Sequence, residues 1–261
     1  MDVRLDNRIA LITGGSLGLG RAMATEFARS GASVAIVSRR QPTIDEAIEH
    51  ISAHAPDATV RGYSCDVRDA AAIAETHAAI VADLGSVDIL VNNAGTSAAK
   101  PILTVSDEDW YNDLDLKLMA AVRLNRLCIP AMAEQGWGRI INVLNTAAKA
   151  PGAKTAPTSV SRAAGMALSK AMASELAPMG ILVNALNTGI LVTDQWHKMH
   201  ERIAPEKTYE DFLEASGRQV PIGRMGDAAE FANLACFLAS DMASYITGTA
   251  INVDGGLAPV V

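Results

Sequence analysis

The chain has 261 residues, a formal net charge of −7 and a pI near 5.2. Hydrophobic residues make up 49% of it and charged residues 20%, which supplies the core of one large domain and excludes a disordered chain. The acidic balance argues against nucleic acid or an anionic membrane surface as a partner.

The N-terminal residues MDVRLDNRIA lack the apolar run of a signal peptide, and no later run approaches the ~20 apolar residues that cross a bilayer. The cysteines, Cys65, Cys128 and Cys236, are odd in number and far apart in apolar segments. This pattern predicts buried free thiols in a reducing compartment. We therefore expect a cytoplasmic protein that does not span a membrane.

Short apolar runs alternate with longer amphipathic ones along the whole chain. The runs expected to be strands are Arg8–Ile12, Ser33–Ser38, Thr59–Cys65, Ile89–Asn92, Arg139–Leu144, Leu182–Leu186 and Ala250–Val253. The stretches expected to be helices are Leu19–Ser30, Pro42–His54, Ala70–Leu84, Asp107–Glu134, Ser159–Leu176 and Ala228–Ala239. Because most strand runs are apolar at consecutive positions, they are typical of a parallel sheet buried on both faces. The pattern predicts one α/β domain over residues 1–261, with a doubly wound, Rossmann-type sheet of seven parallel strands.

The first strand leads into TGGSLGLG, residues 13–20, and then into a helix. Such a turn lets the backbone approach a pyrophosphate, and the helix N-terminus supplies free N–H groups with partial positive charge. Gly14 suits the tight turn, Gly18 the close approach to the phosphates and Gly20 the packing of helix on strand. An ordinary strand–helix turn is the alternative, but the place of the motif after the first strand favours a dinucleotide site.

The second strand ends in VSRR, residues 37–40. Sites for NAD(H) usually carry a carboxylate here, which would repel the 2′-phosphate of NADP(H). Ser38 is neutral, and a guanidinium from Arg39 or Arg40 can hold a phosphate in a bidentate fork. We expect NADP(H) in preference to NAD(H). The alternative is that the two arginines only belong to the solvated surface, where arginines are common.

Three further motifs complete a resemblance to the short-chain dehydrogenase/reductase family, and to its 3-oxoacyl-carrier-protein reductases, over almost the full length. TGGSLGLG matches TGxxxGxG, CDV at residues 65–67 matches the adenine-contacting segment, and NNAG at residues 92–95 matches a motif over the cofactor. The tail from PIGRMGD to NVDGG also fits the family. The resemblance implies these cofactor-binding residues: Gly14, Ser16, Leu17, Gly18, Leu19, Ser38, Arg39, Asp66, Val67, Asn93, Ala94, Gly95, Arg162, Gly189, Leu191 and Thr193.

The family's Asn, Ser, Tyr and Lys catalytic residues are all replaced. The resemblance places Lys117 at the Asn position, seven residues after Trp110, and Asn145 at the Ser position; a one-residue slip would put Thr146 there instead. The Tyr and Lys positions hold Thr158 and Arg162, within PTSVSRAAG. No tyrosine lies between Tyr111 and Tyr209, so no small shift restores the family's acid.

The replacements keep part of the chemistry. Arg162 stays charged and can hold ribose hydroxyls, while Asn145 can donate a hydrogen bond to a carbonyl oxygen. Thr158 is a far weaker acid than a tyrosine, and its oxygen would serve equally as a helix N-cap. Lys117 can titrate and act as acid or base if it is buried, or it can simply pair with Asp113 four residues earlier.

Residues 190–223 are long for a connection and carry aromatic and polar side chains in an irregular helical pattern, which predicts a substrate lid. His50 and His54 share a helix face without a third ligand, so we expect no metal. Apolar and small residues on the stretches 107–134 and 159–176 predict a homotetramer.

The pattern as a whole predicts an atypical NADP(H)-dependent oxidoreductase that interconverts a carbonyl and an alcohol on a small, largely apolar substrate. Two alternatives stay open. The first is a non-catalytic cofactor-binding subunit or sensor, and the second is a non-redox dehydratase or isomerase on the same fold.

Overall fold

Seven strands form one parallel sheet in the order β3-β2-β1-β4-β5-β6-β7 in the computed structural model, which describes residues 2–261 except the Lys198 side chain. The strands are β1 Ile9–Thr13, β2 Ser33–Ser38, β3 Val60–Ser64, β4 Ile89–Asn92, β5 Gly138–Asn145, β6 Ile181–Thr188 and β7 Ala250–Val253. Every pairing is parallel, from Val34 opposite Val60 at one side of the sheet to Thr188 opposite Val253 at the other. The predicted doubly wound α/β sheet is confirmed.

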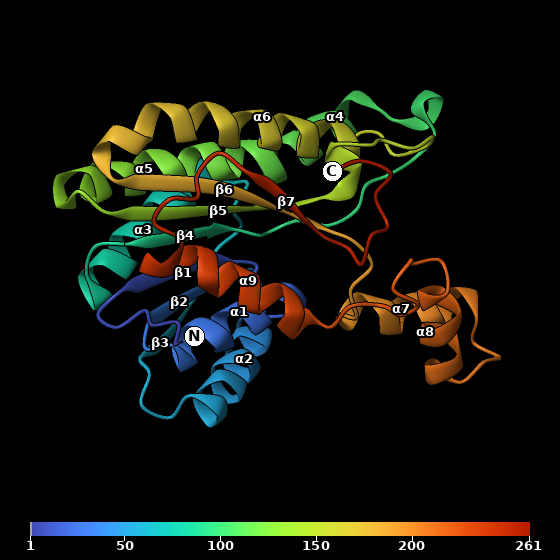
Figure 1. Cartoon of the computed structure of the whole chain (residues 1–261), viewed down its shortest axis with the longest axis horizontal. Helices are drawn as coiled ribbons and strands as arrows, with labels where there is room; N and C mark the ends of the chain where they lie inside the picture. Colours follow the sequence, from blue (N-terminus) through green and yellow to red (C-terminus); the bar gives the residue numbers. More distant parts are fainter. Residues whose placement is uncertain (1) are drawn as a thin grey trace.

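Helices cover both faces of the sheet (Figure 1). They are α1 Gly18–Arg29, α2 Gln41–His54, α3 Ala70–Leu84, α4 Asp107–Leu114, α5 Ala120–Gln135, α6 Thr158–Leu176, α7 Asp194–Ile203, α8 Tyr209–Gly217 and α9 Ala228–Ala239. Phe27 and Phe231 join α1 and α9 in the core on one face, and Ile80 and Leu124 join α3 and α5 on the other. Burying each such side chain contributes about 1.5–3 kcal/mol, so the apolar stripes fix which face each helix covers.

The expected helix over residues 107–134 is interrupted. Between α4 and α5 lies a π-helical turn, Asp115–Met119, which turns the Lys117 side chain into the protein interior. Short π-helical turns inside α-helices occur frequently at functional sites. The predicted capping box at the start of α4 is confirmed, since Ser106 and Asp109 exchange side-chain-to-backbone hydrogen bonds.

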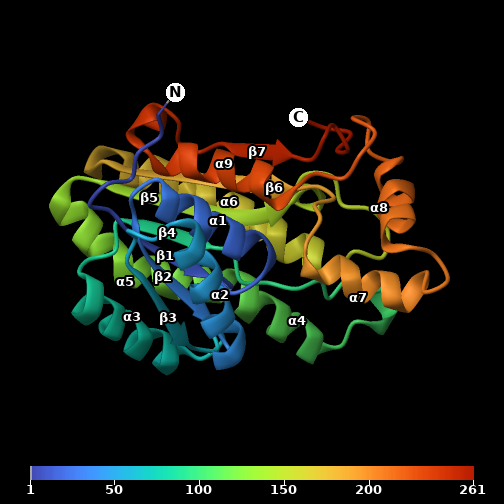
Figure 2. The ribbon, with the colours of Figure 1, turned by 90° about the horizontal axis from the view of Figure 1, so that it is seen from below.

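The long connection at residues 190–223 contains α7 and α8, which lie beyond the end of the sheet (Figures 1 and 2). Their packing is aromatic: the Phe212 ring lies 5.8 Å from that of Trp196 and 5.3 Å from that of His200. Phe212 is buried by these contacts. The segment therefore forms a small body of its own beside the strand ends.

The cysteines are unpaired and buried, as predicted. Burial raises the pKa of Cys128 to about 12 and that of Cys236 to about 11, so both thiols stay protonated and inert. Within the described part of the chain, no helix combines the length and apolar character needed to cross a membrane.

Candidate active site

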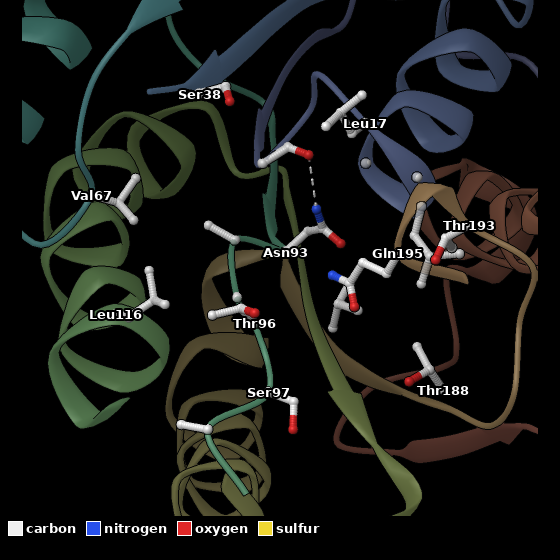
Figure 3. A pocket seen from close by; sticks show the side chains of 18 of the residues that line it. Leu17, Ser38, Val67, Asn93, Thr96, Ser97, Leu116, Thr188, Thr193 and Gln195 are labelled. Carbon is white, nitrogen blue, oxygen red and sulfur yellow. Dashed lines mark hydrogen bonds between the residues drawn. The ribbon is translucent and has the colours of Figure 1, made fainter. Parts of the chain in front are cut away.

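A cleft of about 1010 Å³ opens at the carboxyl ends of the strands. Segments that follow β1 to β6 form its walls, and α7 closes one side. The chain reverses its strand order between β1 and β4, and such a switch point is where parallel sheets bind their ligands. Figure 3 shows the side chains of Leu17 and Ser38 at one end of the pocket and those of Ser97 and Thr188 at the other.

All residues that the sequence assigned to cofactor binding line this cleft, from Gly14 to Thr193. Asn145, Thr158 and Arg162 line it too, whereas Thr146 and Lys117 are not among its lining residues. The structure thus brings together positions that lie up to about 180 residues apart in the sequence.

The glycine-rich turn is built for close backbone packing. Gly14 has a positive φ of 64°, and a Cβ on Gly20 would lie 2.1 Å from the Gly14 carbonyl oxygen. Helix α1 can therefore begin directly on the turn only because both residues lack side chains. The N-cap residue Leu17 makes no side-chain capping hydrogen bond, and Asp194 accepts from the Gly18 amide. The first residues of α1 line the cleft, where phosphate oxygens could accept from their amides.

The loop after β4 is tied to the same turn. Thr13 Oγ1 accepts hydrogen bonds from the amides of Asn93 at 2.9 Å and Ala94 at 3.0 Å. Asn93 Nδ2 donates in return to the Thr13 carbonyl at 2.9 Å. The NNAG segment is thus held directly against the glycine-rich turn, and its residues Asn93, Ala94 and Gly95 line the cleft.

At one end of the cleft, Ser38 and two arginines form a cationic corner. Ser16 Oγ donates to Ser38 Oγ at 2.8 Å, and Arg39 and Arg40 are both exposed and line the cleft beside them. The nearby Asp66 is engaged by Arg68, whose hydrogen bonds keep the pKa of that carboxyl below its ordinary value. The corner therefore offers guanidinium groups to a phosphate.

Arg162 also lines the cleft, in the second turn of α6. Its Nη1 donates to the Val143 carbonyl at 2.8 Å, while its Nε is buried without a hydrogen-bond partner among the described residues. Burial lowers the pKa of Arg162 to about 10, so it keeps its charge at neutral pH. A buried cation with an unused donor is suited to a ligand with hydroxyl or phosphate oxygens.

Asn145 ends β5 and presents a free amide. Its Oδ1 is buried and has no partner within the described residues. Since buried amides are normally hydrogen-bonded, an unsatisfied one in a cleft is a candidate ligand contact. The unsatisfied Oδ1 would accept a hydrogen bond from a ligand, and the expected donation to a substrate oxygen would come from Nδ2 of the same amide.

Lys117 reaches the cleft only through another side chain. Its Nζ pairs with Asp113 one turn earlier and donates to Thr158 Oγ1 at 3.0 Å, with only 1% of the Lys117 side chain exposed. The pairing with Asp113 that the spacing allows is therefore present. Burial lowers the pKa of Lys117, opposed by Asp113 and reinforced by Arg162.

The helix-cap role for Thr158 is wrong. Pro157 occupies the N-cap position of α6, and Thr158, the first helical residue, makes no capping hydrogen bond. Its Oγ1 instead accepts from the Ala98 amide at 2.9 Å, because the loop after β4 passes directly over the start of α6.

Residues 14–258 match the family model described as "Enoyl-(Acyl carrier protein) reductase". The chain is 32% identical to the 3-oxoacyl-[acyl-carrier-protein] reductase of Escherichia coli over 255 residues, covering 98% of this chain and 99% of that protein. It is 33% identical to the 3alpha-hydroxysteroid dehydrogenase of Mediterraneibacter gnavus, covering 98% of each. The chain belongs to the short-chain dehydrogenase/reductase family.

Solved structures of this family superpose closely on the chain. The L-sorbose reductase of Gluconobacter frateurii, complexed with NADPH and L-sorbose, has a TM-score of 0.95 at 32% identity, and each chain is covered completely. An NADPH-bound short chain oxidoreductase of Pseudomonas aeruginosa, described as containing an atypical catalytic center, has a TM-score of 0.91 at 31% identity over 99% of each chain. The same fold thus occurs in a protein that is described as having an atypical catalytic center.

Several site residues in this family member escaped sequence reasoning. Asp194, at the start of α7, accepts a hydrogen bond from the Gly18 amide at 2.8 Å and pairs with Arg21 at 3.7 Å. Trp196 and Met199 of α7 also line the cleft. Only the irregular composition of residues 190–223 pointed to them, because no local pattern shows which side of a connecting helix faces a cleft.

Proposed function

We propose that the protein is an NADP(H)-dependent oxidoreductase that interconverts a carbonyl and an alcohol on a small, largely apolar substrate. The observation that carries this proposal is one continuous cleft. It joins the cationic corner at Ser38, Arg39 and Arg40 to an inner end with Asn145 and Thr158. A dinucleotide spanning that distance would have its 2′-phosphate at the corner and its nicotinamide at the inner end.

The residues present fit this cofactor. The glycine turn admits a pyrophosphate at α1, and Arg162 has an unused buried Nε that can meet ribose hydroxyls. A bound reduced nicotinamide would supply the hydride. The NADPH complexes of the similar Gluconobacter and Pseudomonas proteins support the same choice of cofactor.

The inner end suits a small substrate. Leu116, Trp196 and Met199 add apolar surface to the lining of the cleft, and Asn145 would supply a donor for the carbonyl oxygen. Residues 190–223 would act as the lid that excludes water over this end, since α7 forms part of its wall. Ser97 and Thr188 add hydroxyl groups, so a test panel should include hydroxylated ketones as well as apolar ketones and 3-oxoacyl thioesters.

Two measurements test the proposal together. Titration with NADPH and NADH should show tighter binding of NADPH, and carbonyl compounds should then be reduced to alcohols in step with NADPH oxidation. Failure to bind either dinucleotide would overturn the proposal. Tight NADPH binding without turnover would favour the alternative of a non-catalytic cofactor-binding protein, which the loss of the tyrosine at position 158 supports.

A further inference from the structure

The Thr158 hydroxyl is held in an unusual way. Its Oγ1 accepts two hydrogen bonds, from the Ala98 amide at 2.9 Å and from Lys117 Nζ at 3.0 Å. A hydroxyl oxygen has two lone pairs and one proton, so both acceptor positions are used. Its proton has no acceptor within the described part of the chain, and Thr158 lines the cleft. The hydroxyl is therefore oriented to donate into the cleft.

The cation behind this hydroxyl is fixed in place. Asp113 binds Lys117 through one carboxylate oxygen, and its other oxygen accepts from Ser161 Oγ at 2.6 Å. Lys117 and Asp113 are almost completely buried, with 1% and 2% of their side chains exposed. The charged groups that act on Lys117 are Asp113 from α4 and Arg162 from α6. A buried ion pair directed at a single hydroxyl polarises that hydroxyl strongly.

We propose that Thr158 donates the proton to the substrate oxygen and that Lys117, held by Asp113 and Ser161, resupplies it. This inference rests on the proposed carbonyl reduction. The carbonyl carbon accepts the hydride from the reduced dinucleotide, which is thereby oxidised. The O–H bond of Thr158 breaks as that of the alcohol forms, and an N–H bond of Lys117 breaks as the Thr158 hydroxyl is restored.

Thr158 can act as the proton donor because its proton transfer to the substrate is coupled to the transfer from Lys117 to Thr158. An aliphatic hydroxyl is too weak an acid to ionise alone, but here no free alkoxide forms because a proton arrives as one leaves. Lys117 is left neutral, a form that its lowered pKa favours, and it regains a proton from water through Thr158 after the product has left. Thr158 is thus a catalytic residue, whereas Lys117 and Asp113 act through it as positioning residues.

Four variants test the relay, each assayed for turnover, NADPH affinity and thermal unfolding. Thr158→Val should lower turnover by about 10²–10⁴-fold, the usual contribution of a general acid. Thr158→Ser, the conservative variant that keeps a hydroxyl, should rescue most of that loss. Lys117→Arg keeps the charge and the ion pair but cannot release a proton, so it should lose activity like Thr158→Val. NADPH affinity should stay within about twofold in all of them, since none of these groups supplies the expected cofactor contacts.

Asp113→Asn, the fourth variant, gives a readout that a merely structural role would not move. Reduction requires protonated Lys117, so turnover should fall as pH rises through the pKa of that amine. Removing the negative charge of Asp113 lowers the pKa of Lys117. The fall in turnover at alkaline pH should therefore begin at a lower pH than in the wild type. NMR titration of the Lys117 side chain in dinucleotide-free protein should show the same shift.

The outcomes separate the relay from the function on which it rests. A wild type that binds NADPH but reduces no carbonyl compound contradicts the proposed function. An active wild type with equally active Thr158→Val or Lys117→Arg variants contradicts the relay alone. The relay is also overturned if the alkaline limb of the pH profile of turnover stays in place in Asp113→Asn. It is likewise overturned if Thr158→Val leaves the Lys117 pKa unchanged in the NMR titration.

Discussion

At the scale of single residues, cofactor choice depends on a few charges at the end of β2. Arg39 is exposed and lines the cleft beside Ser38. Arg39→Asp would remove a guanidinium and add a carboxylate that repels a 2′-phosphate and accepts from a ribose hydroxyl. We predict that this variant binds NADH more tightly than NADPH.

Fluorescence titration with both dinucleotides measures that preference. The control is Arg61→Asp, because Arg61 is also exposed and its replacement changes the net charge equally, but it lies on β3 outside the cleft. Equal affinity of the wild type for the two dinucleotides, or an unchanged ratio in Arg39→Asp, would show that the arginines are only solvated surface.

A second residue-scale prediction concerns the space around Arg162. A Cβ on Gly95 would lie 2.6 Å from Arg162 Nη2, so Gly95→Ala must displace the guanidinium. Because Nη2 is the far end of a long side chain, the guanidinium can shift, and it then leaves the position in which it would meet a ribose hydroxyl. NADPH affinity should fall roughly five- to 100-fold. Gly152→Ala is the matched control, since its nearest neighbour would be 3.9 Å away. Calorimetry that finds equal NADPH affinity in both variants would exclude Arg162 as a ribose contact.

The sequence predicts the contacts of the site residues where the partners are close in the chain. It does not predict the contacts between distant segments. Lys117 follows Asp113 by four residues on continuous helical backbone, so their pairing could be expected from the spacing. The contact of Thr158 with Lys117 and Ala98 joins three separate segments, and it depends on the π-helical turn and the path of the loop after β4. Hydrophobic periodicity predicts single elements, and it does not predict a contact between three separate segments.

At the scale of elements, the start of α7 lies against the expected phosphate site. Asp194 accepts from the Gly18 amide, one of the first amides of α1, where a pyrophosphate would bind. Asp194→Asn preserves the shape but removes the negative charge that competes with the phosphates. The gain should be about 0.5–1.5 kcal/mol, and NADPH should bind up to roughly tenfold more tightly.

Stopped-flow binding of NADPH checks this effect and its kinetic origin. Glu201→Gln removes a carboxylate from an exposed position of the same helix and should leave the affinity unchanged. Weaker binding by Asp194→Asn would instead mean that Asp194 stabilises the closed lid over the bound cofactor.

The regular elements were predicted almost residue by residue, including β2 at Ser33–Ser38 and α3 at Ala70–Leu84. Buried strands and amphipathic helices carry strong hydrophobic periodicity, which makes them readable. The bounds of α7 and α8 were not predicted, because both helices are short and lie within one connection, and α7 is mostly polar and lacks the broad apolar stripe of a helix that covers the sheet.

At the scale of the whole molecule, we predict a homotetramer that buries exposed positions on α4 and α6. Tyr111 of α4 is 72% exposed, and Ala167 and Ala171 follow one another along an exposed stripe of α6. Ala167→Glu should dissociate the tetramer, because it places four charges at such interfaces. Ala79→Glu, at an exposed position of α3, serves as the control. Sedimentation velocity that shows a wild-type monomer at micromolar concentration would contradict this prediction.

We propose that this family member reduces carbonyl groups without the usual tyrosine. The most direct test is a single-turnover experiment, with the protein in excess over bound NADPH and a panel of small ketones added. We predict loss of the dihydronicotinamide absorbance with formation of one alcohol per NADPH, at a rate that Thr158→Val slows by about 10²–10⁴-fold. Unchanged absorbance of fully bound NADPH across the whole panel would contradict the claim.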